Sequence, residues 1–145
     1  MAGLSREQSA ALSEARTAVL TTVANDGRPR PVPICYVLGV TEDGRPAIFS
    51  PIDDKPKAGD DPRALARIRD IQEHPEVGVL IDRWSEDWGQ LGWLRVDGMA
   101  AIVEPTSPVV DALRAKYPQY AGHRLEERPM IRIVVDRVRA WGSLA

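Results

Sequence analysis

The sequence is poor in the residues that usually carry catalysis without a cofactor. It contains one cysteine, Cys35, and two histidines, His74 and His123. A single cysteine excludes an internal disulfide and a cysteine-based metal cage, and two histidines exclude a histidine-rich metal site. The H-E-x-x-H, G-x-S-x-G, P-loop and G-x-G-x-x-G patterns are also missing. If the chain is an enzyme, we therefore expect a bound organic cofactor to supply the chemistry.

Long apolar runs and a strong net charge are missing as well. No segment approaches the roughly 20 apolar residues that span a bilayer. The net charge of -2 produces no field that would attract nucleic acid or an anionic membrane. The first residues, M-A-G-L-S-R-E-Q, lack the basic-then-apolar layout of a signal peptide. We expect a cytoplasmic protein that forms one domain over residues 1–145 and binds neither nucleic acid nor membranes.

Turn signals divide the first third of the chain into three strands. Asn25-Asp26-Gly27 and Glu42-Asp43-Gly44 separate the β-rich residues 17–24, 31–40 and 46–50. Pro31 and Pro33 cannot donate ladder hydrogen bonds, so we expect the second strand to begin at a sheet edge. Tight turns between successive strands indicate an antiparallel meander.

Further strands and three helices follow the same kind of signal. We expect strands over residues 76–82, 93–104 and 130–141, with a bulge at Gly98. The helices are expected from Ser5 to Arg16 with a capping box to Gln8, from Asp61-Pro62 to about His74, and from Ser107-Pro108 to about Tyr117. Six or seven mostly antiparallel strands bury their faces best as a small β-barrel with peripheral helices. The fold class is therefore mainly β.

The stretch A-I-F-S-P-I-D-D-K-P-K, residues 47–57, is the most suggestive local pattern. The chain has three lysines and sixteen arginines, and two of the lysines, Lys55 and Lys57, lie here. A compact ammonium suits a phosphate, and prolines hold such a loop extended. One interpretation is a strand end and basic loop that meet an anionic ligand. The alternative is a solvated loop in which Asp53 and Asp54 pair with the lysines.

Three tryptophans, Trp84, Trp88 and Trp93, fall within ten positions among acidic residues. Such large rings pack against a core edge, a subunit interface or a flat ligand. A nucleic-acid stacking platform would need basic neighbours. We favour an interface, which is compatible with a ligand bound in it. The arginines of the second helix either extend the basic surface or form a solvated face with Asp70 and Glu73.

Four motifs together resemble a known superfamily. They are I-D-D-K-P-K, L-x-R-I-R-x-I-x-x-x-P, L-I-D-R-W-S-E-D-W and W-L-R-V-D-G. They resemble the pyridoxamine-phosphate-oxidase-like split-barrel flavoproteins, and more narrowly their branch that depends on the deazaflavin coenzyme F420, over residues 4–141. The resemblance implies a six-stranded antiparallel split β-barrel like that of FMN-binding proteins. It also implies a homodimer with two cofactor sites in the subunit interface.

The resemblance assigns a cofactor site. It implies that Lys55 and Lys57 meet the cofactor phosphate, while Arg63 and Arg67 extend the basic rim toward an acidic tail. Main-chain groups around the ring would come from Pro33, Ile34, Ser50, Pro51 and Ile52. Trp88 of the other subunit would close the site. The arginine-rich C-terminal motif of the pyridoxamine-phosphate oxidases is absent, so we do not expect their reaction.

Three functions compete at this point. The leading one is an oxidoreductase that transfers hydride from reduced coenzyme F420 to an unsaturated or conjugated small molecule. The second is an FMN-dependent enzyme of the same fold. The third is a non-catalytic carrier of a deazaflavin or a tetrapyrrole. The pattern identifies no catalytic acid or base, no metal ligand and no role for Asp53 and Asp54.

Overall fold

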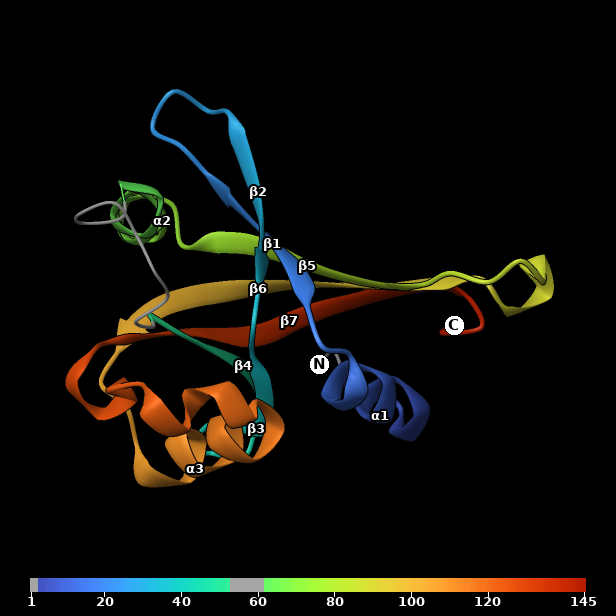
Figure 1. The fold of residues 1–145 in the computed structure, drawn as a ribbon. Helices are drawn as coiled ribbons and strands as arrows, with labels where there is room; N and C mark the ends of the chain where they lie inside the picture. Colours follow the sequence, from blue (N-terminus) through green and yellow to red (C-terminus); the bar gives the residue numbers. More distant parts are fainter. Residues whose placement is uncertain (1–2, 53–61) are drawn as a thin grey trace.

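A seven-stranded antiparallel sheet forms the body of the protein (Figure 1). The computed structural model describes residues 3–52 and 62–145, with the backbone alone for residues 62–65. The strands are β1 (Ala18–Val23), β2 (Pro29–Ile34), β3 (Val37–Val40), β4 (Pro46–Pro51), β5 (Glu76–Arg83), β6 (Gly92–Val103) and β7 (Met130–Gly142). Their order is β2-β1-β5-β6-β7-β4-β3, and every neighbouring pair is antiparallel. The mainly β, antiparallel prediction is confirmed.

The expected six-stranded closed barrel is wrong in strand number and in closure. Residues 31–40, predicted as one strand, belong to β2 and β3, which Cys35 and Tyr36 separate. β2 pairs with β1 at one edge of the sheet, and β3 pairs with β4 at the other. Because the two edge strands follow each other so closely in the chain, the sheet curls and brings its edges together. Among the described strands no ladder joins β2 to β3, so the sheet stays open.

Side chains explain why the strand breaks there. The Ser50 hydroxyl donates to the carbonyl of Cys35 at 2.8 Å, and the Tyr117 hydroxyl accepts from the backbone N–H of Tyr36 at 3.1 Å. These backbone groups are therefore satisfied by side chains where a continuous strand would use a ladder. We name Cys35, Tyr36 and Ser50 the split corner. Pro31 and Pro33 lie on edge strand β2, as predicted.

Three α-helices accompany the sheet. They are α1 (Arg6–Glu14), α2 (Pro62–Glu73) and α3 (Ser107–Lys116), with short 3₁₀ turns η1 (Trp88–Gln90), η2 (Pro118–Gly122) and η3 (Leu125–Glu127). The predicted capping box of α1 is present, since Ser5 and Gln8 exchange hydrogen bonds of 3.1 and 3.0 Å. α3 begins at Ser107, within the predicted Ser107-Pro108 start; Thr106 takes the N-cap position and Pro108 fits the first turn. Asp61, at which the second helix was expected to begin, lies outside the described residues.

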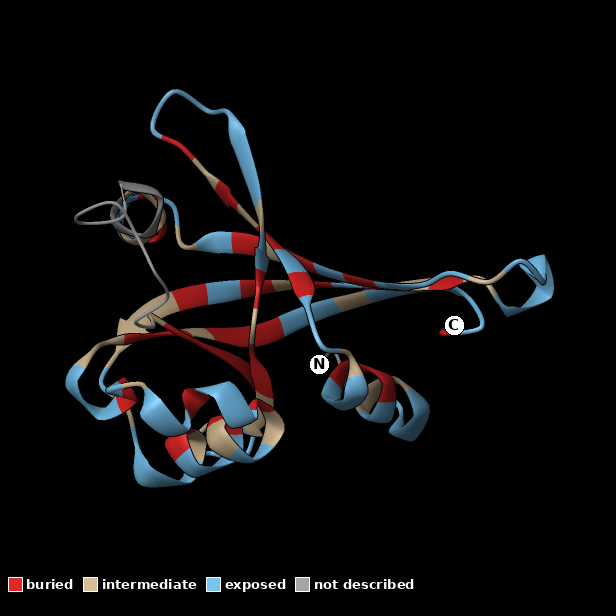
Figure 2. Cartoon of the chain, in the orientation of Figure 1, coloured by how far each residue is buried: buried red, intermediate tan, exposed pale blue. Residues whose placement is uncertain are grey.

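Two apolar clusters hold the elements together (Figure 2). The larger one lies inside the curled sheet and reaches α1 and α2, with Leu20, Ile48, Leu94, Ile131 and Ile133 each fully buried. The smaller one joins β3 and β4 to α3 and the 3₁₀ turns through Phe49, Leu113 and Leu125. The predicted bulge is confirmed between Asp97 and Gly98. A Cβ at Gly98 would lie 2.4 Å from the carbonyl oxygen of Val134, so glycine is required there.

Candidate functional site

The split corner brings together the ends of the two strands to which the ring-binding positions were assigned. Ile34 ends β2 immediately before the corner, and Ser50 and Pro51 end β4 beside it. The Ser50–Cys35 hydrogen bond connects the two strand ends directly. Ile34 is 4% exposed and Ser50 is 1% exposed, and the Ser50 hydroxyl already donates to Cys35. These side chains are therefore turned into the protein, and main-chain contacts of a ligand at this corner stay a prediction.

The remaining predicted residues do not gather at this corner. Pro33 is exposed on edge strand β2, and Ile52 is half-buried against the larger core cluster. Lys55 and Lys57 lie outside the described residues. Arg63 lies on the first turn of α2, and its side chain is not among those described.

Trp88 lies at the tip of the long β5–β6 hairpin, at the opposite end of the molecule from α2 (Figure 1). It is 72% exposed, and its neighbour Trp84 is 69% exposed. These tryptophans therefore do not pack against the core of their own chain. Trp88 cannot reach the split corner within one chain.

A cavity of about 250 Å³ lies between β2 and α2. We call it the β2–α2 cavity, and its lining is Thr22, Arg30, Pro31, Val32, Pro33, Ala66, Arg67 and Asp70. It contains one predicted ring-binding position, Pro33, and one arginine of the second helix, Arg67. Two guanidinium groups and one carboxylate leave the lining with a net positive charge. The cavity is thus suited to an anionic group.

Asp70 is the buried carboxylate of this cavity. Its side chain is 6% exposed, and one of its oxygens, Oδ2, accepts from the Thr22 hydroxyl at 3.1 Å. The same oxygen lies 3.3 Å from Nε of Arg30, whose side chain is 51% exposed. A buried carboxylate needs such partners, because burial of an unpaired charge is costly. Asp70 therefore connects α2 to the first two strands.

Sequence reasoning missed Thr22, Arg30 and Asp70 as members of one cluster. A signal for Arg30 was present in P-R-P-V-P-I, because side chains alternate between the two faces of a strand. Arg30 shares a face with Val32 and the buried Ile34, opposite the prolines. An arginine on the core-facing row of a strand needs a buried partner. Only the register of β1 with β2 and the position of α2 identify that partner.

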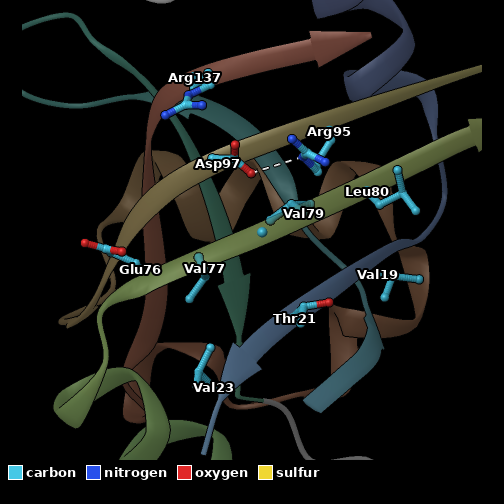
Figure 3. Close-up of a pocket in the computed structure, with 11 residues that line it drawn as sticks. Val19, Thr21, Val23, Glu76, Val77, Val79, Leu80, Arg95, Asp97 and Arg137 are labelled. Carbon is cyan, nitrogen blue, oxygen red and sulfur yellow. Dashed lines mark ion pairs between the residues drawn. The ribbon is translucent and has the colours of Figure 1, made fainter. Parts of the chain in front are cut away.

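A second, larger depression of about 630 Å³ lies on the outer face of β1, β5, β6 and β7 (Figure 3). Val19, Leu80 and Val23 line its apolar part, and Arg95, Asp97 and Arg137 line its charged part. Nε of Arg95 and Oδ1 of Asp97 are 3.2 Å apart. Val19 is 36% exposed and Leu80 is 39% exposed, which places apolar area on a sheet face that this chain does not cover.

Gly78 forms the floor of this depression. In the sheet it pairs with Thr21 of β1 on one side and with Asp97 of β6 on the other. The row of side chains across these strands therefore has a gap at Gly78. A Cβ built at Gly78 would meet only Oδ1 of Asp97, at 4.0 Å. The glycine is therefore not imposed by packing within the chain.

A buried amine lies behind the split corner. Nζ of Lys116, the last residue of α3, is 4.0 Å from the centre of the Tyr36 ring and 5.3 Å from that of Tyr117. Among the described residues it has no hydrogen-bond partner. Burial, followed by the nearby charge of Arg16, lowers the pKa of Lys116 to about 8. Burial, and then the proximity of Tyr117, raises the pKa of Tyr36.

The described residues offer little chemistry of their own. They contain no group of three or more histidine, cysteine, aspartate or glutamate side chains placed to hold a metal ion. His74 follows α2, and His123 follows η2, so neither lines the two hollows. None of the described helices combines the length and apolar character needed to cross a bilayer.

The family model described as Pyridoxamine 5'-phosphate oxidase matches residues 4–142. The match covers almost the whole chain, so the protein belongs to this family. The superfamily resemblance of the sequence motifs is thereby confirmed, whereas the narrower deazaflavin branch stays a prediction. A search of curated proteins finds no match.

Solved structures show the same fold at low sequence identity. The conserved hypothetical protein Rv2991 from Mycobacterium tuberculosis is 21% identical with a TM-score of 0.69, over 98% of this chain and 87% of that one. The heme storage protein HutZ from Vibrio cholerae is 18% identical with a TM-score of 0.64, over 98% and 95%. A FAD-binding protein from Mesorhizobium loti is 20% identical with a TM-score of 0.60, over 94% and 92%. These likenesses show the fold alone, and the fold serves both flavin-binding and heme-binding proteins.

Proposed function

We propose that this protein is a homodimeric oxidoreductase that binds coenzyme F420 and transfers hydride to an unsaturated or conjugated small molecule. The observation that carries the proposal is the meeting of the β2 and β4 ends at the split corner, beside the positively charged β2–α2 cavity. A flat ring needs a shelf of main-chain groups, and an anionic tail needs cations close to it. Pro33 lines the cavity and the next residue, Ile34, ends β2 at the corner, which supports this arrangement.

The residues present fit such a cofactor. Main-chain groups of Pro33, Ile34, Ser50, Pro51 and Ile52 would hold the ring edges. Lys55, Lys57 and Arg63, together with the cavity arginines, would hold the phosphate and the acidic tail. When bound, a deazaflavin supplies two-electron hydride chemistry. The protein then has to orient the ring and the substrate and exclude water, and a dedicated side-chain acid or base is not required.

The second subunit has a defined task in this proposal. The exposed apolar side chains of the outer face and the exposed Trp84 and Trp88 are surface that one chain leaves uncovered. Tryptophan is among the residues enriched in protein interfaces. We assign Trp88 of the partner subunit to the closure of the site. The ring would then be enclosed by both chains, and water would be kept from it.

Binding assays with the purified full-length protein test the cofactor assignment. Coenzyme F420 should bind in preference to FMN, as measured by the change in deazaflavin fluorescence. The Lys55→Ala/Lys57→Ala variant should weaken this binding by at least about tenfold, because a charged hydrogen bond contributes about 1.5–3 kcal/mol. The matched control is Arg28→Ala, since Arg28 is 85% exposed and lies outside both hollows. Equal affinity in the double variant and the wild type would disprove the lysine assignment.

Two other cofactors give distinct outcomes. Tightly held FMN would colour the purified protein yellow and favour an FMN-dependent enzyme, an alternative motivated by the FAD-binding protein of the same fold. A tetrapyrrole carrier is motivated by HutZ, a heme storage protein of this fold. It would bind heme tightly and show no turnover with any electron acceptor. Absorbance spectra of the protein titrated with F420, FMN and heme separate the three.

A further inference from the structure

We infer that the β2–α2 cavity is an oxyanion subsite in which Arg30, held in place by Asp70 and Thr22, binds a carboxylate or phosphate group. The inference rests on the proposed function in one respect, because it gives the anionic part of the cofactor or substrate a site distinct from the lysine loop. Arg30 is not among the residues that the sequence motifs assign.

The position of Arg30 is set from three directions. The prolines at positions 29, 31 and 33 restrict the backbone of β2 on both sides of it. Thr22 is its direct partner in the β1–β2 ladder, and Asp70 reaches it from α2. Oδ2 of Asp70 accepts from Thr22 and lies against Nε of Arg30, so the carboxylate fixes one edge of the guanidinium plane.

The opposite edge of this guanidinium is available. Among the described residues, Asp70 is the one that pairs with Arg30, and it does so at Nε. Half of the Arg30 side chain is exposed, whereas Asp70 is almost completely buried. The planar fork of arginine matches the two oxygens of a carboxylate or phosphate. A pre-positioned fork loses less conformational entropy on binding than a free surface arginine does.

The size and charge of the cavity restrict the ligand group. A volume of about 250 Å³ lies just below the range of about 300–1,000 Å³ that is usual for drug-sized ligands, so the cavity suits one charged group and a short apolar stem. Pro31, Val32, Pro33 and Ala66 provide the apolar wall for that stem. Asp70 would repel an anion if it were unpaired, but it is paired with Arg30, whose side chain lines the cavity and is half exposed.

Titration calorimetry on the full-length protein without cofactor tests the inference. Inorganic phosphate and glutarate are the two probes, and chloride keeps the ionic strength constant. We expect at least one of them to bind, and Arg30→Gln should weaken its affinity about tenfold or more. Arg28→Gln, which changes an exposed arginine of the same hairpin outside the cavity, should leave the affinity unchanged. The stronger probe identifies the group as phosphate or carboxylate.

Two further variants keep the outcome clear. Arg30→Lys keeps a cation beside Asp70 but loses the fork, so it should fold and still bind the anion several-fold more weakly. It decides the question if Arg30→Gln is unfolded by circular dichroism. Asp70→Asn should also weaken anion binding. If Arg30→Lys binds the anion as tightly as the wild type does, the role assigned to the guanidinium fork of Arg30 is contradicted. If neither probe binds in a way that depends on Arg30, the subsite is disproved.

The failure of this inference and that of the proposed function can be told apart. Coenzyme F420 binding, with no Arg30-dependent binding of phosphate or glutarate, would refute the subsite and leave the cofactor assignment intact. Arg30-dependent binding of phosphate or glutarate, without any F420 binding, would support the subsite and refute the cofactor.

Discussion

The split corner and the tip of the β5–β6 hairpin are opposite kinds of structure. At the corner, the backbone groups of Cys35 and Tyr36 are satisfied by side chains from β4 and from the end of α3. At the hairpin tip, Trp84 and Trp88 are 69% and 72% exposed. At the corner, the chain itself satisfies these backbone groups. At the hairpin tip, large apolar side chains stay exposed to solvent. The contrast separates a corner that packing within the chain fixes from a hairpin tip to which the proposed function assigns the subunit contact.

The largest expected effect comes from the hairpin. Replacing Trp84 and Trp88 by serine should weaken the proposed homodimer about thirtyfold or more, because tryptophans at interface centres contribute about 2 kcal/mol or more. Analytical ultracentrifugation over a concentration series measures the dimer dissociation constant. Val40→Ser is the control, since Val40 is 67% exposed on edge strand β3, which β7 and β4 separate from the hairpin strand β6.

The thermal stability of the tryptophan variant shows whether the substitutions affect dimerisation alone or folding as well. Under conditions where wild type and variant are both monomeric, their Tm values should agree closely, since exposed side chains contribute little to folding. An unchanged dimer dissociation constant would show that the hairpin tip is not part of a subunit interface.

An intermediate effect is expected at the corner. Tyr117 is 5% exposed, and its hydroxyl accepts from the Tyr36 N–H at 3.1 Å and donates to the Arg16 carbonyl at 2.8 Å. Tyr117→Phe leaves a buried N–H without its partner, which costs about 1–3 kcal/mol. For a chain of this size, we expect Tm to fall by about 2–10 °C.

Tyr36→Phe provides the comparison for this variant. The Tyr36 hydroxyl donates to the carbonyl of Leu12, and its loss leaves no buried donor behind. Its Tm should therefore fall less than that of Tyr117→Phe, as measured by differential scanning calorimetry. A larger loss in Tyr36→Phe would mean that the corner depends on the anchor to α1 more than on Tyr117.

The smallest effect concerns the pH dependence of stability and Lys116. Its pKa is lowered from 10.5 to about 8 in the folded protein, mainly by burial. Between these two values the unfolded chain binds more protons than the folded one, so stability should rise with pH from about 8 toward 10. Above about 10 the raised pKa values of Tyr36 and Tyr117 act in the opposite direction, and stability should fall.

Lys116→Met isolates this contribution. Methionine fills similar space without a titrating group, so the rise between pH 8 and 10 should flatten. Chemical denaturation at pH 7, 8.5 and 9.5 measures the difference between variant and wild type. Parallel pH profiles for the two proteins would show that the Lys116 amine is solvated in the folded state.

The local strand pattern predicts the position of Arg30 but not its partner. Alternation along P-R-P-V-P-I places Arg30 on the face of Ile34, and the prolines place the strand at an edge. Both are local properties of the chain. The partner Asp70 lies forty positions later, and nothing in the spacing identifies it. A buried ion pair between distant residues is a product of packing, and so the cavity was found only in the structure.

The sequence by itself determined the class of this protein. Local backbone preferences set the turns at residues 25–27 and 42–44, the Ser5–Gln8 capping box and the Gly98 bulge. Each of these is found where the sequence predicts it. The motifs also identified the superfamily to which residues 4–142 belong.

Tertiary structure alone decided the break at Cys35 and Tyr36. Residues 31–40 have a continuous strand pattern, because strand propensity reports only local conformation. The break arises because Ser50 and Tyr117, fifteen and eighty-one positions away from their partners, take the backbone groups that a ladder would use. Hydrogen bonds over such separations exist only once β4 and α3 have packed. They divide one predicted strand between the two edges of the sheet and create the corner on which the proposed site depends.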